Sequence, residues 1–531
     1  MKEVFKCTIK IMSPVHVGCD EVYEPTSFVV DENERQLIHF DPPVFIAGLE
    51  PDDREKFSLI CRKGTINSIL EIYKFFRGKS AEGRRVDLCS GFLDHYKTTL
   101  SIPEGNARRI QQELNNFSIQ RTAFRVSDNR PYLPGSSIKG SLRTGCLNAK
   151  CNGAKIPLPP KNQSGHGGYN VTKKNFNEYV EKKLLNYRQI EEDPFGKVKV
   201  SDFQPVGDVK TSIIYAVNQK KKISDKTAGG PYQIFEVIEP GSLFQGEIEV
   251  VDSVFRNPLN GRTTSYINDP LNLKSLLSGA FEFYRKEHQR ENRELAGVRI
   301  PTLNMAGQTS AASDLSPESG QNSSNLKESN ISPLRIGRHS GAECVTIEGN
   351  RDIKIMLGKK EKKFLDHATT LWLASDKPRT ASLNSLKPFG WIAVEALTPE
   401  KKEAFDSREK EYAERINREA TEKAEAVKRH IEEEKKIIKE AQEKEAESQR
   451  KQEEEENLKK TLESLGTEER FIFEYDMGNI QEDQVNFIFK RIDEMDEKFK
   501  KEIASRIASY WQKNNMWTKS QAGRQWKKVR E

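Results

Sequence analysis

The chain has 531 residues, enough for two or three domains, and its 35% hydrophobic and 31% charged residues are typical of a protein with a large exposed surface. The formal net charge of +6 is the difference between 86 Lys plus Arg and 80 Asp plus Glu, so any field that attracts a polyanion must be local. Seven cysteines without a Cys-x-x-Cys pair argue against a disulfide scaffold and indicate a reducing compartment. No apolar run approaches the ~20 residues of a membrane span, so we expect a cytoplasmic protein that does not contact membranes.

The N-terminal region predicts alternating strands and helices. Residues 3–12 alternate apolar and polar side chains, as a half-buried strand does, and lead into the loop Ser13-Pro14-Val15-His16-Val17-Gly18. Extended segments at 23–30 and 36–40 precede helical residues 52–76, an order typical of a ferredoxin-like unit. The apolar residues of 66–76 have helical spacing, so we expect them to face the core.

Residues 133–145 combine a glycine turn with a helix start. Pro134 and Gly135 end an extended run, and Ser136 or Ser137 is expected to cap the following helix. The free N–H groups at such a helix start suit an anion.

Two cations follow in the same helix. Lys139 and Arg143 are four residues apart and share a helix face, while Gly140 leaves space beside Lys139. The segment predicts contact with a phosphate backbone, although a solvated basic helix face explains the same residues. It is not a Walker A loop, because Ser141 stands where that motif requires Lys.

The second half of the chain predicts an antiparallel sheet. Residues 193–202 form a turn and a short basic strand, and further strands are expected at 210–217, 232–238 and 244–251, followed by a helix at 271–295. Residues 303–333 have low complexity and are expected to be disordered. A basic loop between glycines, Arg335-Ile336-Gly337-Arg338-His339-Ser340-Gly341, comes next, and we expect Trp391 beyond it to lie in the core.

Four of these segments occur in a recognisable order: Ser-Pro-Val-His-Val-Gly at 13–18, Pro-Gly-Ser-Ser-Ile-Lys-Gly-Ser-Leu-Arg at 134–143, the Phe-Gly to Ser-Asp strand at 195–202, and Arg-Ile-Gly-Arg-His-Ser-Gly at 335–341. Over about residues 1–398 they resemble the RAMP superfamily of CRISPR-associated proteins, and most of all the capping subunits of type III-A (Csm) effector complexes. The resemblance implies an α+β fold of two ferredoxin-like (RRM-like) domains. We expect these at 1–205 and 206–398, the second with the disordered insertion at 303–333.

The resemblance also implies a function in antiviral defence. Such a subunit binds guide RNA (crRNA) near its 3′ end, terminates the filament of backbone RAMP subunits and supports crRNA maturation. The implied partners are crRNA, the backbone RAMP and small helical subunits of the complex, and host nucleases that trim the guide.

The expected mechanism is binding without sequence readout, because a guide-binding subunit must accept every spacer. Cations would neutralise phosphates, glycines would let the main chain approach them, and the two histidines would stack or hydrogen-bond at sugar or base. We expect no catalytic residue and no cofactor, and no metal either, because Cys146, Cys151 and His166 match no standard zinc-finger spacing. The residues expected to bind RNA are His16, Gly135, Ser137, Lys139, Gly140, Arg143, Arg335, Gly337, Arg338, His339 and Gly341.

Two alternatives remain open. The first is a metal-independent endoribonuclease that processes precursor crRNA, with His16 as general acid or base. Asp20 and Asp202 are not expected to be catalytic. The second is an adaptor that recruits a nuclease through the charged C-terminal helix.

The C-terminal third has a different composition. Residues 399–466 predict a charged helix whose sparse aliphatic residues do not keep a heptad, so we expect a solvated helix supported by i,i+4 ion pairs rather than a coiled coil. Residues 467–531 predict a helical basic region with Trp511, Trp517 and Trp526 among cations. That pattern fits core tryptophans better than base stacking, although it allows both.

Overall fold

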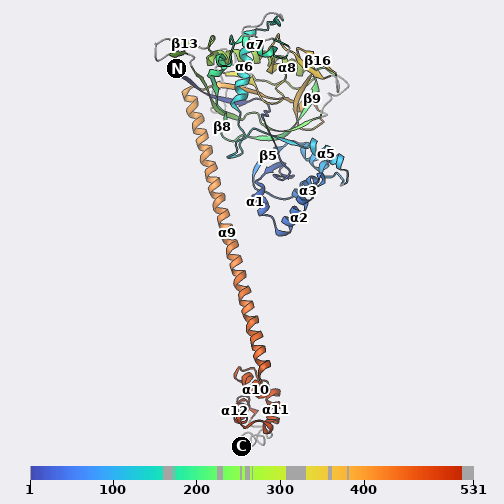
Figure 1. Cartoon of the computed structure of the whole chain (residues 1–531), viewed down its shortest axis with the longest axis vertical. Coiled ribbons are helices and arrows are strands. Elements are labelled where there is room, and N and C mark those ends of the chain that lie inside the picture. Colours follow the sequence, from blue (N-terminus) through green and yellow to red (C-terminus); the bar gives the residue numbers. More distant parts are fainter. Residues whose placement is uncertain are drawn as a thin grey trace. The chain divides into compact units, whose positions relative to one another are not determined.

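The computed structural model of the chain describes residues 2–103, 105–159, 171–172, 174–223, 231–251, 254–256, 263–265, 267–305, 331–356, 361–379 and 382–516. The chain divides into two compact units, Met1–Arg415 and Ile416–Glu531. The first contains two large sheets with helices, and the second is helical (Figure 1). The predicted α+β class is therefore confirmed. The insertion expected at 303–333 lies mostly outside the described residues, and its last residues belong to a strand.

Sheet A, the first of the two large sheets, contains a ferredoxin-like motif. Its order is β14-β19-β1-β11-β7, with β8 also paired to β11, and every pairing is antiparallel. Helix α6 lies in sequence between β1 and β7, and helix α8 between β11 and β19, so these elements form a split βαββαβ unit. The bounds are β1 Lys2–Ile11, β7 Val198–Val200, β8 Gln204–Pro205, β11 Leu243–Val251, β14 Ile331–Arg335, β19 Trp391–Ala396, α6 Gly135–Cys151 and α8 Leu273–Gly297.

This connectivity corrects the expected division at 205/206. The ferredoxin-like unit of sheet A draws β1 and α6 from before that point and β11, α8 and β19 from after it. The second large sheet also takes strands from both sides. Local strand and helix patterns carry no information about which distant strands pair. The predicted domain boundary therefore fell at a point where the chain crosses from one sheet to the other.

One face of sheet A packs on α6 and α8. Leu142 and Leu276 from the helices share a core with Ile9 and Phe244 from the strands, all of them buried. The helices approach closely because Gly145 has no side chain: a Cβ there would lie nearer to the Ala280 backbone than the 3.0 Å that real Cβ atoms keep. Trp391 is fully buried, as predicted.

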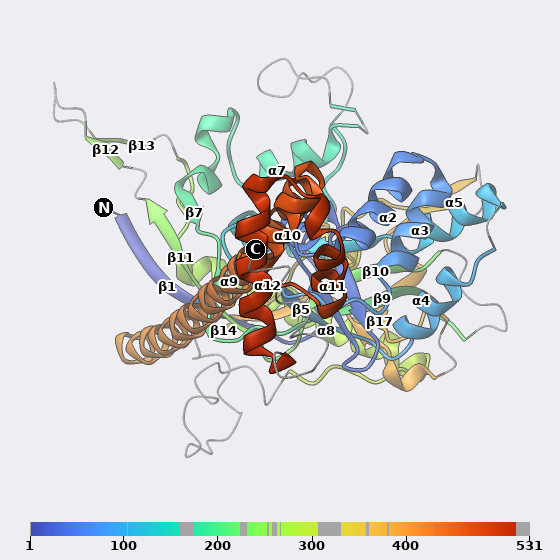
Figure 2. The same ribbon diagram turned by 90° about the horizontal axis from the view of Figure 1, so that it is seen from below.

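Sheet B has nine strands, with the main order β2-β6-β10-β9-β5-β4-β3 and with β17 and β18 attached beside β9. The β10–β6 and β5–β9 pairs are parallel. Helices α3, α4 and α5 pack on one face, where Leu70 and Tyr73 of α3 are buried as predicted; Figures 1 and 2 show these helices beside sheet B. The bounds are β2 Gly18–Val22, β3 Phe28–Asp31, β4 Gln36–His39, β5 Arg84–Leu88, β6 Ile119–Thr122, β9 Thr211–Lys220, β10 Gln233–Ile238, β17 Thr370–Ser375, β18 Lys387–Pro388, α3 Ile66–Phe76, α4 Phe92–Leu100 and α5 Ala107–Asn116.

The remaining elements of the first unit are short. They are the helices α1 Pro42–Ala47, α2 Pro51–Arg62 and α7 Phe176–Leu184, and the two-stranded ribbons β12 Val254–Arg256 with β13 Thr263–Ser265 and β15 Ile353–Met356 with β16 Lys362–Leu365.

Helix α9, Pro399–Ser464, begins in the first unit. Its residue Phe405 is buried with Val206, Leu243 and Leu397. One turn later Glu409 pairs with Arg130 at 3.4 Å and accepts a hydrogen bond from the Gly207 N–H. The start of the helix is therefore part of the body of the protein and not a free linker.

The second unit combines the rest of α9 with three short helices. Pairs such as Lys451–Glu447 and Lys460–Glu456 connect successive turns of α9, as expected for a solvated helix. Helices α10 Thr467–Asp476, α11 Glu482–Lys490 and α12 Glu497–Lys513 share a core that includes Trp511. This confirms a core role for Trp511, while Trp517 and Trp526 lie outside the described residues. None of the described helices is long and apolar enough to cross a membrane.

Candidate nucleic-acid interface

The start of α6 is stabilised from a distant part of the chain. Pro134 occupies the N-cap without a side-chain cap, and the Gly135 N–H donates to Asp202 Oδ1 at 2.8 Å. A Cβ at Gly135 would collide with the Val200 carbonyl oxygen. The expected cap by Ser136 or Ser137 is therefore wrong, and Gly135 makes room for the chain after β7 rather than for a ligand.

The two cations of α6 have different surroundings. Arg143 contacts Glu181 at 2.8 Å and Asp193 at 2.9 Å, so its charge is already neutralised by two carboxylates. Lys139 makes no hydrogen bond or ion pair within the described residues, and partial burial lowers its pKa. Of the predicted pair, Lys139 is free to bind a phosphate, whereas Arg143 connects α6 to α7 and the turn at 193–197.

The other predicted residues of α6 lie near Lys139. Gly140 is exposed, with open space where a Cβ would be, and Ser137 is half-buried. At this helix start Ser136 and Gly140 are exposed, and Ser137 and Lys139 are half-buried.

The N-terminal loop and the late basic loop meet at His16. The Arg338 N–H donates to the His16 carbonyl at 2.8 Å. Gly337 has φ +78°, and a Cβ there would collide with the same carbonyl oxygen. Two predicted segments more than 300 residues apart are thus one structural feature, and Gly337 is required by its left-handed backbone and by this close contact.

A column of four aromatic rings lies on one face of sheet B, where the two loops meet. His16 stacks on Phe235 of β10 with ring centroids 4.2 Å apart, and Phe235 is 5.4 Å from His339. His339 in turn stacks on Trp372 of β17 at 4.4 Å. Phe235 and Trp372 were not predicted, because only the pairing of β10, β9 and β17 brings them to one face.

Both histidines of this column are neutral at pH 7. His16 is fully buried, its Nδ1 lies 2.8 Å from the Glu236 carbonyl oxygen, and burial lowers its pKa. Burial, together with Arg338, lowers the pKa of His339 to about 3. His339 has Phe235 on one face and Trp372 on the other. Neither ring is placed to stack on a sugar or base as expected.

Arg335 lies in the interior. Its guanidinium contacts Glu291 of α8 at 2.7 Å and donates through Nε to the Phe389 carbonyl. Only 1% of its side chain is exposed, so the predicted phosphate contact is incompatible with its burial. Gly341, with φ +78°, turns the chain beside this guanidinium.

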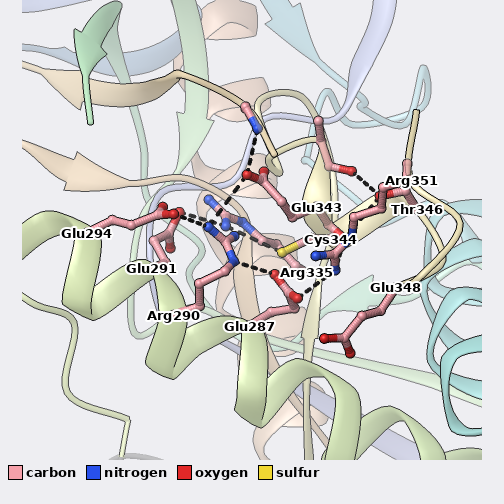
Figure 3. A network of polar contacts seen from close by, with 12 residues as sticks. Glu287, Arg290, Glu291, Glu294, Arg335, Glu343, Cys344, Thr346, Glu348 and Arg351 are labelled. Carbon is pink, nitrogen blue, oxygen red and sulfur yellow. Dashed lines mark hydrogen bonds and ion pairs between the residues drawn. The ribbon is translucent and has the colours of Figure 1, made fainter. Parts of the chain in front are cut away.

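Arg335 and Glu291 are part of a larger polar network (Figure 3). Arg290 contacts Glu287 and Glu294, and Lys221, the residue after β9, contacts Glu294 and Glu343. Although burial alone would raise it, Arg290 and Lys221 hold the pKa of Glu343 at about 2. The network connects α8, the chain after β9 and the chain that follows β14, and thereby fixes the base of the 335–341 loop.

Arg338 is the exposed cation of this loop. It donates to Gln120 Oε1 at 2.8 Å, and its guanidinium lies 5.4 Å from the Phe235 ring centroid. His339 Nε2 lies 2.8 Å from Gln233 Oε1 on the next strand. The site that the structure brings together therefore consists of Arg338, the ring column and two glutamines. The described residues contain no cluster of side chains suited to a metal ion.

Comparison with known proteins identifies a family. A family model described as RAMP superfamily matches residues 8–296. No curated protein matches the chain.

Two solved structures are similar to the chain. One is a cryo-EM structure of a Csm-crRNA-target RNA ternary complex in a type III-A CRISPR-Cas system, where 74% of this chain aligns with 100% of a chain at 18% identity and a TM-score of 0.43. Another is the crystal structure of T. onnurineus Csm5, where 72% of this chain aligns with 99% of that chain at 16% identity and a TM-score of 0.38. Because the family model covers more than half of its residues, the chain belongs to the RAMP superfamily.

Proposed function

We propose that this RAMP protein is a guide-RNA binding subunit of a type III-A CRISPR effector complex. In this proposal it caps the filament of backbone subunits near the crRNA 3′ end and supports crRNA maturation. Its partners are crRNA, the backbone RAMP subunits, the small helical subunits and the host nucleases that trim the guide.

The observation that supports this proposal most is the meeting of the His16 loop with the 335–341 loop on sheet B. The contact leaves Arg338 exposed on a face of sheet B that also carries the half-buried Trp372 ring and the amide side chains of two glutamines. Cations beside aromatic rings are the combination that single-stranded RNA binds without sequence readout.

The contacts that we propose are with phosphate. Lys139 and Arg338 neutralise backbone charge, and Ser137 and Gly140 allow RNA to approach α6. Arg143 and Arg335, each paired with carboxylates, position the elements that carry these groups.

The structure gives the endoribonuclease alternative little support. A general base must reach the substrate, whereas His16 is fully buried and its Nδ1 is engaged with the Glu236 carbonyl. The adaptor role is supported by the separate core of the second unit, which makes it a candidate recruitment module in addition to RNA binding.

Salt-dependent RNA binding tests the phosphate contacts. Each lost phosphate contact should lower the slope of log affinity against log salt by roughly 0.7 for single-stranded RNA. We expect this decrease in Lys139→Gln and in Arg338→Gln, and no change in Lys274→Gln, which removes an exposed cation on α8 that has no ion-pair partner among the described residues. Unchanged slopes in both test variants would show that these residues do not contact RNA.

A further inference from the structure

The ring column ends at Trp372, and we propose that the indole of Trp372 is a stacking site for one unpaired RNA base. This inference rests on the proposed RNA-binding function and adds a base contact to its phosphate contacts. Arg338, Gln120 and Gln233 lie further along the same column, where they contact the Phe235 ring or the polar side chains beside it.

The order of the rings identifies Trp372 as the ring on which a base can stack. His16 and Phe235 are buried, and His339 is covered on both faces by Phe235 and Trp372. Trp372 is only half-buried and has His339 on one side, so it is the ring through which a base can extend the column. Stacking on an aromatic side chain tolerates every base, as a guide-binding protein requires.

The polar groups around the column suit a nucleotide. The oxygens of Gln120 and Gln233 accept hydrogen bonds from the Arg338 and His339 side chains, while their amide nitrogens have no partner among the described residues. Those nitrogens are donors for the carbonyl or ring acceptors of a base. Arg338 supplies a positive charge for the adjoining phosphate.

Two polar atoms at the column lack partners. His16 Nε2 and Asn218 Oδ1 are buried without a hydrogen bond in the described part of the chain. Asn218 pairs with Trp372 across β9 and β17, so the two side chains share a face of the sheet. The Asn218 oxygen is therefore an unpartnered acceptor on the face of the sheet that carries the indole.

The backbone of His339 also differs from that of an ordinary core residue. Its φ of +62° is one that few non-glycine residues adopt, and such conformations concentrate at functional sites. A small hydrophobic core separate from the main cores would explain why Phe235 and Phe389 pack together. It does not explain a left-handed histidine, an exposed arginine and unpartnered polar atoms around the same rings.

The test uses the full chain and a short single-stranded uridine RNA that carries one internal 2-aminopurine. Stacking on Trp372 should quench the fluorescence of this base. Trp372→Leu should remove the quenching and weaken binding by roughly 5- to 100-fold without changing the salt slope. Trp372→Tyr, which keeps an aromatic ring, should retain most of the quenching and most of the affinity.

Two controls separate this site from the phosphate contacts. Arg338→Gln should lower the salt slope but retain the quenching at saturating protein. Phe364→Leu, at an aromatic residue of β16 that is 48% exposed, should change neither. If Trp372→Leu binds and quenches like the wild type while Arg338→Gln still lowers the slope, the base site is wrong and the proposed function stands. If the wild type does not bind the RNA, both fail.

A measurement on the wild-type protein covers the case in which Trp372→Leu does not fold. Ultraviolet crosslinking to the same RNA, mapped by mass spectrometry, should place a crosslink on the peptide that contains Trp372. Crosslinks confined to other aromatic residues would contradict the proposal.

Discussion

His339 shows how a single residue couples the stability of the 335–341 loop to pH. Its ring lies between Phe235 and Trp372, and its pKa falls from the ordinary 6.5 to about 3, mainly because of burial. The pKa values of His39 and His95 are lowered to about 4, also mainly by burial. These groups bind protons more tightly in the unfolded chain than in the folded one.

A decrease in pH should therefore destabilise the protein already at pH values well above those at which ordinary carboxylates titrate. The contribution of His339 is complete above its unfolded pKa near 6.5 and is lost as the pH falls from 6.5 toward 3. Between pH 7 and pH 5 this one residue should account for about 2 kcal/mol of unfolding free energy. Urea denaturation at both values should show a smaller loss for His339→Asn, in which Asn tolerates the positive φ. An equal loss in both proteins would contradict a neutral His339.

Gly337 offers a second prediction at the scale of one residue. Gly337→Ala should destabilise the protein by about 2–4 kcal/mol, because Ala resists the φ of +78° and its Cβ would collide with the His16 carbonyl. Gly140→Ala is the matched control. It lies in α6 with open space around it and should stabilise the helix by about 0.5–1 kcal/mol. Thermal unfolding of both variants measures the contrast, and equal effects would show that the two loops do not meet as described.

At the scale of elements, helix α8 is held against the sheets by buried charge. Glu291 contacts the Arg335 guanidinium through one oxygen and accepts a hydrogen bond from Trp391 Nε1 at 2.7 Å through the other. A carboxylate with both oxygens engaged in this way fixes α8 relative to β14 and β19. It also orients the start of the loop that carries Arg338.

Removal of one member of the Glu291–Arg335 pair should lower the unfolding free energy far more than replacement of both members. Glu291→Ala should lower the unfolding free energy by about 3–5 kcal/mol, because it leaves Arg335 charged and buried. The double variant Glu291→Leu/Arg335→Met should recover much of that loss. Glu282→Ala, which breaks an exposed pair with Arg285 on the same helix, should change stability by less than about 1 kcal/mol. Chemical denaturation would contradict this account if Glu291→Ala matched Glu282→Ala.

Much of the element order was predictable, because it depends on local patterns. The alternation of residues 3–12 and the helical spacing of 66–76 correspond to β1 and α3. The charge pattern after 399 corresponds to α9. The partners of individual side chains were not predictable. Arg143 meets carboxylates 38 and 50 residues away, and the buried Arg335 meets one on α8, so pairing with carboxylates removed two of the four predicted phosphate contacts.

At the scale of the whole molecule, the two units of the chain have separate cores, and the first ends within α9. The turns of α9 that include Phe405 and Glu409 belong to the first unit. A protein truncated after Arg415 should therefore keep the stability and RNA affinity of the full chain. A protein truncated after Thr398 should be less stable, because it exposes the apolar surface that Phe405 covers.

Thermal unfolding and RNA binding of these two truncations test the division. Equal stability of the two truncated proteins would contradict the role of the first turns of α9. If the second unit is a recruitment module, the chain truncated after Arg415 should lose bound protein partners while it retains RNA. Retention of every partner would remove the support for that module.

The central claim, that this RAMP protein holds guide RNA in a type III-A complex, is tested most directly by purification of the tagged chain from its native host. Sequencing of the bound RNA and mass spectrometry of the bound proteins would compare the wild type with Lys139→Gln/Arg338→Gln. We expect CRISPR-derived guides together with other type III-A subunits, and less guide RNA with the double variant. Recovery of neither guides nor such subunits would contradict the claim.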